Sequence, residues 1–124
     1  MDTLDVIAEG CNSQAFANNS NDILICVYAT KTDGTAVEGL QVGSFKVQQV
    51  AGSGTISSNK ISFIIEEKQT NANFPGFYTL SVPIQKGNIW GKGEYVFAVL
   101  VTLMQGKGIP PLIGRTLAKL TIPG

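Results

Sequence analysis

The most informative segment of the sequence is Trp90-Gly91-Lys92-Gly93-Glu94-Tyr95-Val96-Phe97-Ala98-Val99-Leu100-Val101. Its first residues include two glycines, which favour a turn. A Gly-x-Tyr step then leads into an unbroken run of aromatic and β-branched residues, which favour extended backbone. The stretch therefore predicts a turn followed by a long strand that begins near Tyr95.

The rest of the chain shows the same strand pattern. Apolar residues alternate with polar ones over short segments, and Gly, Pro, Asn and Ser separate these segments. We expect about seven strands and find no clear helix signal. The predicted strands cover residues 4–8, 22–30, 44–50, 61–68, 77–84, 95–104 and 115–122. Five aromatic residues are expected mostly in the core: Tyr28, Phe45, Phe63, Phe77 and Phe97.

Length and charge limit the functional classes. The 124 residues fit one domain over positions 1–124, with room for a core. Nine basic and nine acidic residues give a formal charge of zero, and charged residues make up only 15%. This balance argues against nucleic acid as a partner. No apolar run reaches the roughly 20 residues of a membrane span.

Three short motifs resemble a known family. They are Asp33-Gly34-Thr35-Ala36-Val37-Glu38-Gly39-Leu40, Gly76-Phe77-Tyr78-Thr79-Leu80 and Gly93-Glu94-Tyr95-Val96-Phe97. In this order they are similar to immunoglobulin-like modules of bacterial surface and secreted proteins, over roughly Asp22 to Ile122. Ala36 stands where those modules usually have proline. The resemblance implies an all-β, immunoglobulin-like antiparallel β-sandwich of about seven strands with a structural or binding role.

The same resemblance assigns a role to Tyr95. In such sandwiches a tyrosine near the start of a central strand is buried, and its hydroxyl bonds to backbone a few residues upstream. We expect the same of Tyr95.

Catalytic signatures are missing from the sequence. There is no histidine, so catalytic triads and histidine metal sites are impossible. The carboxylates are scattered and form no calcium-loop motif. We therefore expect no enzymatic activity, no cofactor and no metal site.

The two cysteines, Cys11 and Cys26, allow two interpretations. A disulfide would close a loop of about 15 residues and stabilise the fold by roughly 3 kcal/mol. Two buried free thiols are equally ordinary in a reducing compartment. The compartment also stays open: an excised domain favours the cell surface or exterior, and a complete reading frame favours the cytoplasm.

The candidate binding surface is the segment before the last strand, with Ile109, Pro110, Pro111 and Leu112. These residues either form a rigid apolar knob for a partner or fold back to plug the end of the sandwich. Trp90 has a similar pair of interpretations, as a surface anchor or as packing at the end of the core.

The leading functional hypothesis is a non-enzymatic structural or protein-binding module. It would contact a protein partner or neighbouring domains, with a homo-oligomer through an edge strand as one mode. A carbohydrate-binding module is the second hypothesis, with Trp90, Tyr78 or Phe16 as a stacking platform. A subunit of a capsid, tail or pilus type of assembly is the third.

Overall fold

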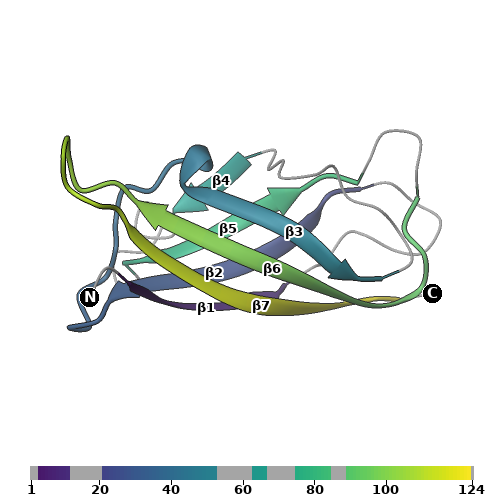
Figure 1. Ribbon diagram of the computed structural model, residues 1–124. Helices are drawn as coiled ribbons and strands as arrows, with labels where there is room; N and C mark the ends of the chain where they lie inside the picture. Colours follow the sequence, from purple (N-terminus) through teal and green to yellow (C-terminus); the bar gives the residue numbers. More distant parts are fainter. Residues whose placement is uncertain (1–2, 12–20, 53–62, 67–74, 85–88, 124) are drawn as a thin grey trace.

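The computed structural model describes residues 3–11, 21–52, 63–66, 75–84 and 89–123 (Figure 1). The described residues are almost entirely strand or connecting loop, with one short 3-10 turn, η1 (Val42–Ser44). The strands are β1 (Leu4–Gly10), β2 (Ile23–Lys31), β3 (Phe45–Ala51), β4 (Phe63–Glu66), β5 (Phe77–Val82), β6 (Gly93–Leu103) and β7 (Leu112–Ile122). The prediction of an all-β fold is confirmed.

The strands form two sheets that lie over one another as layers (Figure 1). One sheet has the order β1-β2-β5-β4 and the other the order β3-β6-β7. Every strand pair within these sheets is antiparallel. The chain thus crosses between the layers after β2, after β3 and after β5.

Among the described residues, one apolar core fills the space between the sheets. Alternate residues of β2, from Ile23 to Ala29, are fully buried, and so are alternate residues of β6, from Tyr95 to Val101. Side chains of both sheets belong to the same buried cluster. The period-2 alternation in the sequence therefore marks the inner face of each strand.

Tyr95 occupies the place expected for it. It lies near the start of β6, the middle strand of its sheet, and its side chain is fully buried. Its hydroxyl donates a hydrogen bond to the Gly91 carbonyl oxygen at 3.0 Å and accepts one from the Gly91 N–H at 3.0 Å. The expected burial and upstream backbone bond are both confirmed.

Two of the aromatic residues expected in the core lie elsewhere. Phe45 and Phe97 are buried, but Tyr28 and Phe77 are only half-buried and stack on each other at a centroid distance of 4.4 Å. They alternate with the buried Val27 and Tyr78, so they belong to the outer face. The burial of Phe63 lies outside the described part of the chain.

Strand boundaries also differ from the prediction. β7 begins at Leu112, three positions before the predicted start, because its pairing with β6 continues to Leu103 opposite Leu112. β5 ends at Val82, just before Pro83, which has no backbone N–H for a ladder bond. Residues 61–62 and 67–68 of the predicted fourth strand lie outside the described residues.

Candidate functional site

The candidate surface is the connection between β6 and β7, residues 104–111, which projects beyond the sheets (Figure 1). Met104 is 70% exposed and Ile109 is 52% exposed, and Pro110 is exposed beside them. We call Met104, Ile109 and Pro110 the apolar tip. Three apolar side chains of this one connection are thus in water, and exposed apolar surface that is grouped together marks interaction sites.

Backbone and side-chain bonds define the shape of this loop. The Ile109 N–H donates to the Gly106 carbonyl oxygen at 3.2 Å, and the Gln105 Nε2 donates to the Pro110 carbonyl oxygen at 2.9 Å. Gly108 has a φ of 79°, a conformation that glycine adopts at least cost. The loop is therefore a structured turn, so binding a partner would not require the loss of entropy that ordering a loose loop requires.

The structure divides the four predicted loop residues between the two interpretations. Ile109 and Pro110 point into solvent, as a knob would. Pro111 is half-buried, and Leu112 is 8% exposed and pairs with Leu103 as the first residue of β7. The knob and the plug are thus adjacent parts of one segment.

Met104 begins the segment singled out in the sequence but was not among the predicted binding residues. Met104 directly follows the last residue of β6, where the alternating burial of the strand ends. Val42 of η1 is 42% exposed, and η1 contacts β6. An apolar residue one step past a long strand was the signal available in the sequence.

Trp90 does not belong to the surface. Its side chain is fully buried, its Nε1 donates to the Asn21 carbonyl oxygen at 2.7 Å, and its ring meets the edge of Tyr95 at a centroid distance of 5.4 Å. The binding role predicted for Trp90 is therefore wrong in the form of a surface anchor. The alternative, packing at the end of the core, describes its position.

The aromatic residues predicted to form a carbohydrate platform are not available on the described surface either. Tyr78 is 1% exposed, its hydroxyl donates to the Val37 carbonyl oxygen at 2.7 Å, and it accepts from the Leu40 N–H at 3.2 Å. Phe16 lies outside the described residues. Neither Trp90 nor Tyr78 can stack on a sugar, because no ring face of either reaches solvent.

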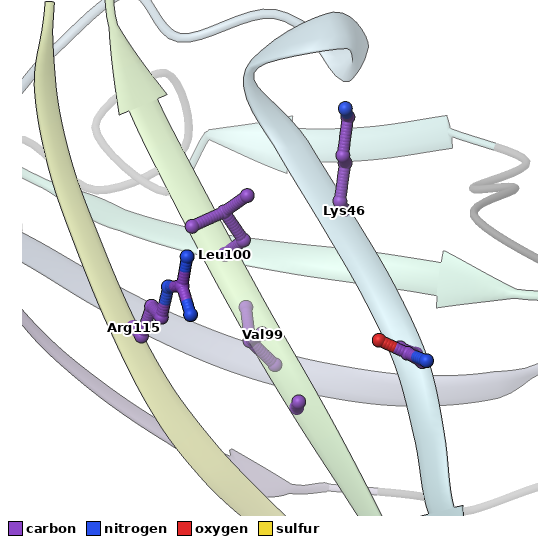
Figure 2. A pocket seen from close by; sticks show the side chains of 6 residues that line it. Lys46, Val99, Leu100 and Arg115 are labelled. Atoms are coloured by element: carbon purple, nitrogen blue, oxygen red, sulfur yellow. The ribbon is translucent and has the colours of Figure 1, made fainter.

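A shallow hollow of about 190 Å³ lies on the outer face of the β3-β6-β7 sheet. Figure 2 shows the Arg115 side chain of β7 beside Leu100 of β6, with Lys46 on β3. Ala98 lies between Gln48 and Leu117 in the strand register, and its small side chain leaves space on this face. Two cations, the Gln48 amide and apolar carbon line the hollow, so it would favour an anionic or apolar group of a partner over a cation.

Cys11 and Cys26 form a disulfide, with Cα atoms 6.0 Å apart. The Cys11 N–H also donates to the Leu24 carbonyl oxygen at 3.0 Å. The bond joins the loop after β1 to the middle of β2, on the outer side of the four-stranded sheet. Of the two interpretations of the cysteines, the structure has the bonded one.

Ionisable groups give few signs of chemistry. The pKa of the Asp33 carboxyl is lowered by hydrogen bonds from the Thr35 side chain and backbone N–H, the latter at 2.9 Å. Within the part of the chain that the structure describes, no three Cys, Asp or Glu residues are grouped so as to hold a metal ion. The same part contains no helix with the length and hydropathy of a membrane span.

We compared the chain with protein-family models, with curated proteins and with solved structures, and none of the three comparisons gave a match.

Proposed function

We propose that this protein is a non-enzymatic module of immunoglobulin-like fold that binds a protein partner through the apolar tip. The exposure of Met104 and Ile109 on a structured turn carries the proposal. The partner is expected to offer an apolar cleft that accepts these two side chains and Pro110.

The strand order supports the fold assignment. Immunoglobulin constant-type sandwiches have four strands in the order A-B-E-D and three in the order C-F-G. If β1 to β7 are read as A to G, the two sheets have this arrangement. The bonds between the Tyr95 hydroxyl and Gly91 have the pattern of the tyrosine corner in the same fold.

The physical cost of the tip supports a binding role. Each exposed apolar side chain gives up the roughly 1.5–3 kcal/mol that burial would provide. Gln105 and Gly108 hold the loop in one shape, which lowers the entropy lost on binding. Tips of sandwich domains are common binding sites because a rigid scaffold positions them.

The disulfide supports a location outside reducing compartments. Disulfides persist in secreted and surface proteins and are rare in the cytoplasm. A bond between Cys11 and Cys26 is therefore expected of a module at the cell surface or beyond.

The test is site-specific photo-crosslinking in the cells that produce the protein. A photoreactive amino acid at position 109 is compared with one at Val50, which is 59% exposed at the other end of the β3-β6 pair. We expect one discrete protein adduct from position 109 and none from position 50. Equal adducts from both positions, or none from position 109, would contradict the proposal.

A second arm separates binding from folding. Met104→Ser and Ile109→Ser remove only exposed apolar groups, so each is expected to change the free energy of unfolding by no more than about 0.5 kcal/mol. With the photoreactive group placed at Pro110, either substitution should abolish the adduct. A persistent adduct would show that the tip is not the binding surface.

A further inference from the structure

Two edge strands carry matching rows of side chains with opposite charge. On β1 the exposed residues are Asp5, Ile7 and Glu9, which we call the acidic row. On β7 the exposed residues Arg115, Leu117 and Lys119 form the basic row. Each row places an apolar residue between two like charges, with neighbours about 7 Å apart along the strand. Ile7 is 68% exposed and Leu117 60% exposed.

The two rows lie level with each other along one seam of the molecule. Figure 1 shows β1 and β7 following the same edge of the sandwich. Residues that meet across this seam are Thr3 with Ile113 in a parallel bridge, Leu4 with Gly114 and Gly10 with Leu120. Each pair is 110 positions apart (113 − 3, 114 − 4, 120 − 10), so the register is constant along the seam.

Glycines allow this close approach. A Cβ added to Gly114 would lie 2.7 Å from the Leu4 carbonyl oxygen, and one added to Gly10 would lie 2.6 Å from the Lys119 carbonyl oxygen. Both distances are too short for a real side chain. The constant register places Asp5 level with Arg115, Ile7 with Leu117, and Glu9 with Lys119.

This arrangement is complementary to itself. A two-fold axis parallel to the strands exchanges the rows, so the acidic row of one copy would face the basic row of the other, twice. Such an interface is isologous and closes at two subunits. With the register preserved, Asp5 would face Arg115 of the second copy and Ile7 would face its Leu117.

We propose that a second copy of this chain docks on the seam and forms a two-fold dimer through reciprocal contact of the acidic and basic rows. Charge complementarity identifies the occupant, since a seam with both signs in register selects a surface with the same two rows exchanged. The seam is independent of the apolar tip, so the dimer does not rest on the proposed function.

The area of the interface and the exposure of its charges determine how tightly the two copies are expected to associate. A stable interface buries about 1,600 Å² in total, and two rows of three side chains provide less. Within one chain, the level charges are exposed and contribute little to each other, as surface ion pairs do. We therefore expect a concentration-dependent dimer that weakens as salt rises, because added ions screen exposed charges.

The experiment uses light scattering during size exclusion and sedimentation equilibrium over a range of protein and salt concentrations. One variant reverses the acidic row, Asp5→Lys with Glu9→Lys, and a second reverses the basic row, Arg115→Glu with Lys119→Glu. A third carries all four substitutions. Thermal unfolding of each variant checks that it is folded.

Wild type should approach twice its mass of 13.1 kDa at high concentration and low salt. Each double variant should associate at least about tenfold more weakly, because its seam meets like charges. Equimolar mixing of the two double variants should restore a 1:1 dimer, and the fourfold variant should dimerise alone. The rescue by mixing separates a lost interface from a damaged fold.

Several results would overturn the proposal. Wild type that stays monomeric throughout would exclude the dimer. Masses that grow past two subunits would indicate an open stack in place of the two-fold contact. Double variants that dimerise as wild type does, or that fail to associate when mixed, would show that the rows do not form the interface.

Discussion

The Tyr95 hydroxyl and the Gly91 peptide group bond to each other twice, because the hydroxyl donates to the carbonyl oxygen and accepts from the N–H, each at 3.0 Å. The two residues are four positions apart, so one side chain fixes the loop that leads into β6. Trp90 packs against the same ring and bonds to Asn21. The start of β6 is thereby tied to the segment before β2 in the other sheet.

Replacing Tyr95 with phenylalanine tests this corner. Tyr95→Phe keeps the buried ring and removes both bonds to Gly91, so we expect a loss of about 1–3 kcal/mol in the free energy of unfolding. Urea denaturation measures it. Tyr28→Phe is the matched control: this half-buried ring lies on an outer face, and a change within about 0.5 kcal/mol is expected. Equal effects of the two substitutions would contradict the assigned role.

The Tyr78 hydroxyl fixes the connection between β2 and β3, as the Tyr95 hydroxyl fixes the loop before β6. Its hydroxyl donates to the Val37 carbonyl oxygen and accepts from the Leu40 N–H, and both contacts are buried. We expect Tyr78→Phe to cost about 1–3 kcal/mol and to speed hydrogen exchange at the Leu40 amide. An unchanged exchange rate at Leu40 would rule out this bond as its protection.

The disulfide has a measurable effect on stability. It closes a loop over a separation of 15 residues, so reduction should lower the free energy of unfolding by about 3 kcal/mol. Reduction adds two protons and two electrons, so the intact mass should rise by two hydrogen atoms. The double variant Cys11→Ser with Cys26→Ser should have the same free energy of unfolding as the reduced protein, and reductant should not change it. A wild type whose stability does not respond to reductant would contradict the bond.

The turn at Asp33 predicts a local pH effect. Hydrogen bonds from Thr35 lower the folded-state pKa of the Asp33 carboxyl. Its contribution to stability is therefore present above the pKa of the unfolded chain and is lost as pH falls through the lower folded value. Carboxyl titration by NMR should give a pKa below the ordinary range for Asp33. Thr35→Val should raise it, and an unchanged pKa in that variant would exclude the side-chain bond as the main cause.

The sequence predicted features whose partners are near in the chain. The Tyr95 bond spans four positions, so a local motif contains both members. The alternation along β2 and β6 likewise marks buried positions within single segments. Local spacing was therefore enough for the all-β class and for one end of the core.

Features with distant partners could not be read in the same way. Tyr78 bonds to residues 38 and 41 positions away, and Trp90 bonds to one 69 positions away. Tyr28 was misplaced because apolar side chains occupy both faces of β2, so alternation there does not say which face meets the core. Phe77 shares its face of β5 with Thr79 and Ser81, so alternation placed it correctly and its aromatic character was given too much weight. The opposite rows of β1 and β7 become neighbours only when the sheets stack.

The corner, the tip and the seam all depend on the strand order of the two sheets. Cross-strand nuclear Overhauser effects between backbone protons measure this order. We expect contacts between β2 and β5, as at Cys26 and Thr79, and between β3 and β6, as at Val47 and Val99. Contacts that pair β2 with β3 as a sequential hairpin, without those between β2 and β5, would contradict this order.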